Sequence, residues 1–199
     1  ILEHTNNEAP AQVTVLRPNF RVTELSQTLL DCARTLPVLE GCALVDAALH
    51  RRMLAPEEIL PRLQASQNSA ATHIATHADA RSSSLLESVA RLQLVEMGLP
   101  APVHRLDFEA YLLGTSDAHT SNRTSDYAGV YRMLRTRQAS FVWLEQRVGL
   151  ARVASDAALP HADAPTPEGW HMVQVRWEDF YPSSRVLREK LHPYFPQLR

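Results

Sequence analysis

The sequence predicts a mixed protein of the α+β or α/β class, built in two parts. Through the first third of the 199-residue chain, apolar residues recur at helical spacing after a short alternating segment. In the second part, a helical pattern over 82–98 precedes an alternating strand pattern at 171–177 and a closing helix at 182–191. Because 45% of the residues are hydrophobic, the chain can form a packed core.

The first part opens with a predicted hairpin and a helix. β-branched and apolar residues over 13–22 indicate two short strands that turn at Pro18-Asn19. Thr23 then precedes helically spaced apolar residues from Leu25 to Leu36, and we expect its hydroxyl to cap that helix. Pro37 ends the helix.

Two further helices complete this part. Helical spacing continues over 39–49, and the basic residues at 50–52 complement the negative end of the helix dipole. Pro56 begins the third helix, because proline lacks the N–H group that would be unpaired in a first turn. The predicted first domain therefore spans residues 1–63.

Residues 64–80 are small, polar and rich in alanine, which predicts a linker with a short helix. Within it, His73 and His77 stand one helical turn apart, with Asp79 two residues further on. That spacing suits two imidazole ligands of one metal. Since no third strong ligand follows from the sequence, surface histidines are the simpler interpretation.

The second part, residues 81–199, begins with a helix. Three serines at 82–84 offer N-caps, apolar residues from Leu85 to Val95 form the buried side, and Gly98 ends the helix. Glu87 falls between two of the apolar positions. A charge at the edge of an amphipathic helix explains it without any chemistry.

The composition limits the cellular compartments in which we expect the protein. No apolar run approaches the roughly 18 residues that span a bilayer, and the first residues lack a signal-peptide pattern, so we expect a cytoplasmic protein with no membrane partner. Cys32 and Cys42 have no metal-binding spacing and are expected to be reduced thiols. Lys190 is the only lysine in the chain.

The order of residues over 13–63, including R-V-T-E-L-S-Q-T-L-L-D-C-A-R-T-L-P-V-L-E-G-C, resembles the C-terminal region of AbiEi-family antitoxins of type IV toxin–antitoxin systems. In that family an N-terminal winged helix binds the operator. The resemblance implies that such a domain belongs before Ile1, and that a cognate toxin is a possible partner.

Two segments of the second part, D-A-R-S-S-S-L-L-E-S and G-W-H-M-V-Q-V-R-W, resemble the very-short-patch-repair-like endonucleases of the restriction-endonuclease superfamily. Such a domain often follows an AbiEi-type region in actinobacterial proteins. The resemblance implies a restriction-endonuclease-like α/β sandwich. It also implies that Glu87 corresponds to a metal-site carboxylate, followed by a V-D-F strand and a V-E-x-D-G strand.

The other metal-site carboxylates match imperfectly. Asp126 is the nearest match to the V-D-F strand, with Asp107 as its competitor, and residues 142–149 are the nearest match to V-E-x-D-G. In that segment Glu145 remains, but Arg147 replaces the aspartate and brings a positive charge to a cation site. An active site would hold Mg²⁺ through Glu87, Asp126 and Glu145, whereas a degenerate site needs no cofactor.

Arginines dominate the segment between 123 and 152. The segment contains six arginines and two acids, a local excess of four positive charges, and aromatic residues lie between the arginines in the sequence. Such a segment could bind the phosphate backbone of DNA, although an arginine-rich surface exposed to solvent gives the same pattern. The candidate DNA-binding residues are Arg123, Arg132, Arg135, Arg137, Arg147 and Arg152.

Three hypotheses follow. The first is a DNA-associated antitoxin or repressor of a toxin–antitoxin or phage-defence system, with a catalytically weakened nuclease-like domain. The second is an active metal-dependent DNA endonuclease, and the third is a protein-interaction module with no nucleic-acid role. Convergence of the three carboxylates on one point favours the second hypothesis. The oligomeric state and the operator do not follow from the residues.

Overall fold

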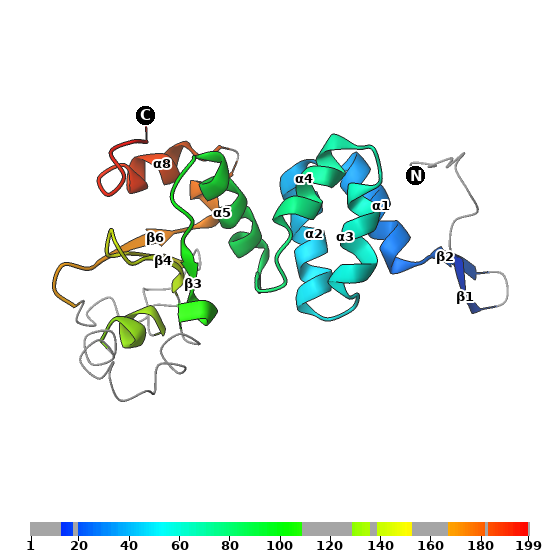
Figure 1. Cartoon of the computed structure of the whole chain (residues 1–199), viewed down its shortest axis with the longest axis horizontal. Helices are drawn as coiled ribbons and strands as arrows, with labels where there is room; N and C mark the ends of the chain where they lie inside the picture. The colour runs from blue at the N-terminus through cyan, green and yellow to red at the C-terminus, as the bar shows by residue number, and fades with distance from the viewer. Residues whose placement is uncertain are drawn as a thin grey trace. The chain divides into compact units, whose positions relative to one another are not determined.

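The computed structural model describes residues 13–17, 20–108, 129–135, 139–152, 167–181 and 183–198. The chain forms two compact units, Ile1–Val89 and Ala90–Arg199, which we call the helical unit and the sheet unit and describe separately. Their elements are mixed α and β, as the sequence predicts (Figure 1). Within the described residues, no helix is long and apolar enough to cross a membrane.

The helical unit starts with the expected hairpin. Strands β1 (Val13–Arg17) and β2 (Phe20–Thr23) pair antiparallel. Helix α1 (Leu25–Thr35) follows, but the prediction that Thr23 caps it is wrong. The N-cap is Glu24, which lies one residue later, and the Thr23 hydroxyl lies 2.7 Å from the Thr28 hydroxyl instead. The Thr28 hydroxyl in turn donates to the carbonyl of Glu24.

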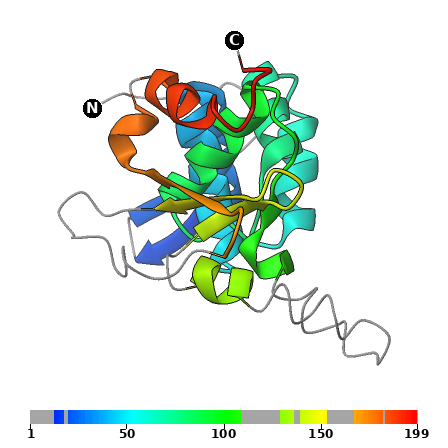
Figure 2. The ribbon, with the colours of Figure 1, turned by 90° about the vertical axis from the view of Figure 1, so that its left-hand side faces the viewer.

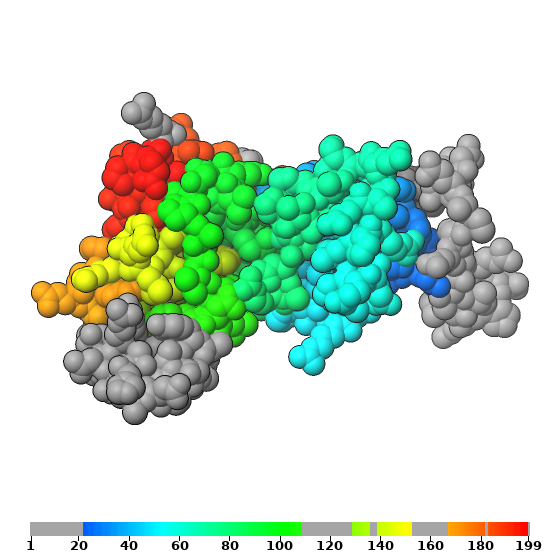
Figure 3. Space-filling model, in the orientation of Figure 1, coloured from blue at the N-terminus to red at the C-terminus, as the bar shows by residue number. Residues whose placement is uncertain are grey.

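Three more helices pack with α1 in the helical unit: α2 (Val38–His50), α3 (Pro56–Gln64) and α4 (Ser69–His77). Proline opens α3, as expected. Figure 3 shows the outer surface that α3 and α4 present. The core is made of small and branched side chains from all four helices: Leu29, Leu30, Ala33, Cys42, Val45, Leu49, Ile59, Leu63, Ala71 and Ile74.

Helix α4 belongs to this core, although its residues were expected in a linker. Ala71, Ile74 and Ala75 are buried, and α4 packs against α2 and α3. A Cβ atom at Gly41 would lie 2.6 Å from Cδ1 of Ile74, so the missing side chain allows α2 and α4 to approach closely. The alanines that suggested a linker are instead the small residues of a tight helix contact.

Helix α5 (Leu85–Glu96) contains the division between the two compact units, which lies between Val89 and Ala90. The serines before it cap it as expected, because the Ser84 hydroxyl accepts the backbone N–H of Glu87 at 3.3 Å. Gly98, with φ of +68°, ends it in a left-handed conformation that suits glycine.

The sheet unit contains a four-stranded mixed sheet in the order β3 (Val103–His104), β4 (Ala139–Trp143), β5 (Val148–Arg152) and β6 (His171–Val175). The first three strands pair antiparallel, and β6 lies parallel to β5. The strand predicted at 171–177 is confirmed over 171–175, where a 3-10 turn, η1 (Trp177–Asp179), follows it. The predicted closing helix is α8 (Arg185–Leu191).

Helices cover both faces of this sheet. Figure 2 shows α8 on one side and helix 129–135 on the other. Helix 129–135 buries Val130, Met133 and Leu134 in a cluster with residues of β4 and β5. On the opposite face, the ring of Trp143 packs edge-on against Phe195, with centroids 5.0 Å apart. The sheet unit is therefore layered as helix, sheet and helix.

Candidate functional site

The acidic strand expected over 142–149 is not a single strand. Residues 144–147 form a turn between β4 and β5, and Trp143 pairs with Val148 across it. Arg147 has φ of +54°, which helps to reverse the chain. Glu145 consequently lies exposed in the turn and not on a strand, so the prediction that residues 142–149 form one acidic strand is wrong.

The other predicted carboxylates lie in different surroundings. Asp107 is exposed in the short helical segment 105–108 that follows β3, whereas Asp126 lies outside the described residues. Glu87 belongs to the helical unit, and Asp107 and Glu145 belong to the sheet unit. Within the described ranges, no group of three or more His, Cys, Asp or Glu residues is arranged to hold a metal ion.

Glu87 has a structural task at the start of α5. One oxygen of its carboxylate accepts the backbone N–H of Ser83 at 2.7 Å and the Ser83 hydroxyl at 2.8 Å. A carboxylate in the first turn also stabilises the positive end of the helix dipole. This arrangement accounts for an acid between two apolar positions.

Among the residues that the structure describes, the four strands of the sheet carry no carboxylate. The residues of β3, β4, β5 and β6 are VH, ASFVW, VGLAR and HMVQV. Ala139 of β4 pairs with Ala151 of β5, and the register shifts between Ala139 and Phe141, so Ser140 lies at an irregularity in the pairing. Ser140 is buried. Neither Ser140 nor Ala151 brings a carboxylate to these two strands.

The described arginines are distributed over the sheet unit. Arg132 and Arg135 are exposed and lie three residues apart on helix 129–135. Arg147 is exposed in the β4–β5 turn, and Arg152 is exposed at the far end of β5. The two other candidates, Arg123 and Arg137, lie outside the described residues.

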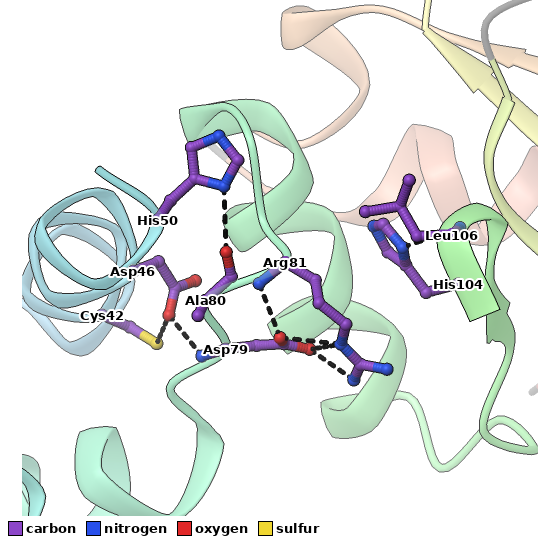
Figure 4. Close-up of polar contacts among 8 residues, drawn as sticks. All are labelled: Cys42, Asp46, His50, Asp79, Ala80, Arg81, His104 and Leu106. Carbon is purple, nitrogen blue, oxygen red and sulfur yellow. Dashed lines mark hydrogen bonds and ion pairs between the residues drawn. The ribbon is translucent and has the colours of Figure 1, made fainter. Parts of the chain in front are cut away.

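A polar cluster that the sequence analysis did not identify ties α2 to the segment before α5 (Figure 4). Asp46 is fully buried, and its Oδ1 accepts the backbone N–H of Asp79 at 2.7 Å. One turn later, Nδ1 of His50 donates to the carbonyl of Ala80 at 2.9 Å, since a carbonyl has no proton to give. Arg81 then pairs with the Asp79 carboxylate at 2.6 Å. The spacing of Cys42, Asp46 and His50, one turn apart, is the signal that was available in the sequence.

A groove of about 440 Å³ lies beside this cluster, between α2 and the start of α5. Its floor includes Ala43 and Ala47, and its rim carries the exposed side chains of Leu44 and Leu85. Its polar lining includes the exposed Glu40 and Arg51, together with His50, which Ala80 holds, and Ser83, which Glu87 holds. Most of the surface of the groove is apolar.

The structure also describes the histidine pair, the two cysteines and the single lysine that the sequence analysis considered. The rings of His73 and His77 lie with centroids 4.5 Å apart on α4, tilted by 47°. Cys32 is partly buried and Cys42 is buried, both as free thiols. Lys190 lies on α8, where its Nζ donates to the Asp179 carboxylate at 2.5 Å and to the Gln174 carbonyl at 3.0 Å. It holds β6, η1 and α8 together.

Comparison with models of protein families, with characterised proteins and with solved structures finds no significant match to this chain.

Proposed function

We propose that this chain is a cytoplasmic, DNA-associated protein of the antitoxin or repressor type, from a toxin–antitoxin or phage-defence system. Its sheet unit is a nuclease-like domain that binds DNA and has weakened or no catalysis. The observation that carries the proposal is the lack of any carboxylate on strands β3 to β6. Metal-assisted phosphodiester hydrolysis needs carboxylates that converge on a cation.

The order of elements supports the nuclease-like part of this proposal. In the family that the sequence resembles, a helix with a glutamate precedes the V-D-F and V-E-x-D-G strands, and the G-W-x-V strand completes the sheet. Here α5 precedes the two-residue strand β3 and then β4 and β5, and β6 completes the sheet beside β5. We take β4 and β5, the two longer strands before β6, as the counterparts of the two acidic strands.

Those counterparts explain why catalysis is weakened. Ser140 precedes Phe141 in β4 as aspartate precedes phenylalanine in V-D-F. In β5, Ala151 follows an apolar residue, at the position of the glutamate in V-E-x-D-G. A serine hydroxyl and a methyl group bring no negative charge to a divalent cation, so neither position adds a carboxylate to the predicted acids Glu87, Asp126 and Glu145.

The exposed arginines support binding to DNA. Arg132 and Arg135 lie one helical turn apart on an outer layer of the sheet unit, and both are exposed. Guanidinium groups bind phosphate oxygens in a bidentate manner and remain charged at every physiological pH. Contacts of this kind give affinity that does not depend on base sequence and weakens as salt rises.

Replacing both Arg132 and Arg135 with alanine is expected to weaken duplex binding, because two phosphate contacts are lost. The slope of log affinity against log salt should become shallower by about 1.8, at roughly 0.9 per phosphate contact in B-DNA. Fluorescence anisotropy of a labelled duplex between low and moderate salt measures both quantities.

The matched control is Arg51→Ala with Arg52→Ala, which removes two exposed arginines from the helical unit and changes the net charge equally. Its slope should equal that of the unaltered protein. An equal loss in both double variants would show a general effect of net charge, and binding that does not respond to salt would contradict the proposal.

A further inference from the structure

Two aromatic rings stand exposed and stacked on the turn after β6. Trp177 is 39% exposed and Tyr181 is 53% exposed. Their ring centroids lie 5.8 Å apart with planes only 19° from parallel. At that distance nearly parallel rings are offset and not eclipsed. Each ring therefore keeps part of its face open to solvent.

The turn that carries these rings is firmly held. The backbone N–H groups of Phe180 and Tyr181 both donate to the carbonyl of Trp177, at 3.0 Å and 3.1 Å. Phe180 is buried at 1% exposure, and its carbonyl accepts Nε2 of Gln93 at 2.8 Å. Asp179 is tied to α8 through Lys190. The rings thus project from a scaffold joined to α5, β6 and α8.

Exposure is the unusual property of Trp177 among the tryptophans of this chain. Trp143 is buried, with its Nε1 donating to the carbonyl of Pro100 at 2.7 Å, and Trp170 is partly buried. Large aromatic side chains contribute most to stability when they are buried. A rigid turn that keeps two of them in water fits a contact surface, since the rings themselves lose little conformational freedom when a partner binds.

We infer that Trp177 and Tyr181 form a stacking platform for an unpaired base of single-stranded DNA. This inference rests on the proposed association with DNA. A nucleobase prolongs a stack of nearly parallel rings, and every base has a flat π face that such a platform can accept. An exposed arginine, Arg176, comes directly before Trp177 and supplies a positive charge for the neighbouring phosphate.

Charges around the platform indicate that stacking supplies most of its affinity. Lys190 is paired with Asp179, and Arg185 is paired with Glu189. Glu178 is exposed within the same turn as Arg176 and offsets its charge. Loss of the Trp177 ring should therefore lower affinity without changing the dependence on salt, in contrast to loss of Arg132 and Arg135.

The test is titration of the whole chain with a short oligo-dT strand and, separately, with duplex DNA. Oligo-dT is expected to quench the tryptophan fluorescence. Trp177→Ala should weaken oligo-dT binding roughly 5- to 100-fold, measured by anisotropy of labelled oligo-dT, with an unchanged salt slope. Trp177→Phe should keep part of the affinity, because phenylalanine also stacks, and duplex binding should be the same in all three proteins.

Trp170→Phe serves as the control, because it removes a partly buried indole and should leave oligo-dT binding unchanged. If the protein binds duplex DNA and Trp177→Ala leaves oligo-dT binding unchanged, the stacking platform is overturned and the proposed function stands. Binding to neither nucleic acid overturns the proposed function itself. Equal losses in Trp177→Ala and Trp177→Phe would show that stacking is not the cause.

Discussion

Replacing Asp46 with alanine is expected to lower the free energy of unfolding of the helical unit by about 2 to 3 kcal/mol, in the range for a buried hydrogen bond to a charged group. The Asp46 side chain is fully buried, and its carboxylate accepts the N–H of Asp79 from a segment 33 residues later. Alanine leaves that N–H group without this acceptor and leaves a small void in the core.

Urea unfolding followed by far-ultraviolet circular dichroism measures this effect. All three tryptophans lie between 143 and 177, in the sheet unit, so their fluorescence follows the other unit and should be unchanged. Asp79→Ala is the matched control, because it keeps the backbone N–H that Asp46 accepts and removes the bonds of the Asp79 side chain to the guanidinium and the backbone N–H of Arg81, so a smaller loss is expected. Equal destabilisation by the two variants would contradict the role given to Asp46.

Lys190→Met is expected to destabilise the sheet unit by about 2 to 3 kcal/mol, somewhat less than the 3 to 5 typical of a fully buried pair. The Asp179 side chain is 9% exposed, and that of Lys190 is 37% exposed. Methionine keeps the apolar stem of the lysine but removes its bonds to Asp179 and Gln174. The Asp179 carboxylate then retains the backbone N–H of Arg176, at 2.9 Å.

Tryptophan fluorescence during urea unfolding reports this loss. Glu189→Gln is the neighbouring control, since it breaks the exposed pair between Arg185 and Glu189, with side chains 83% and 61% exposed, which is worth under about 0.5 kcal/mol. A smaller effect of Lys190→Met than of Glu189→Gln would show that the pair with Asp179 does not hold the sheet unit together.

Much of the fold follows from local signals in the sequence. Pro37, Pro56 and Gly98 mark helix ends because each acts on its own backbone, through a missing N–H group or a left-handed φ. The alternating residues of β6 predict a strand for the same local reason. Tertiary contacts are harder to predict: the alanines of α4 fit a linker equally well until α2 is seen packed against them.

The candidate site is hard to predict for the same reason, because it depends on contacts between residues far apart in the sequence. In the sequence, Glu145 matches the glutamate of the family's acidic strand. In the structure, residues 144–147 form a turn, so strand β5 begins only at Val148. Only the pairing of β4 with β5 shows that Ala139 lies opposite Ala151, next to the irregularity that contains Ser140. The role of Asp46 does not follow from the sequence either, because its partner, the N–H of Asp79, lies far along the chain.

The proposal that the sheet unit binds DNA with weakened or no catalysis is tested most directly by incubating the protein with supercoiled and linear duplex DNA in Mg²⁺ or Mn²⁺. The account predicts a salt-sensitive shift in a binding gel and DNA that remains intact in the same samples. Cleavage that requires the metal and disappears in both Glu87→Ala and Glu145→Ala would contradict the account and establish a metal-dependent endonuclease.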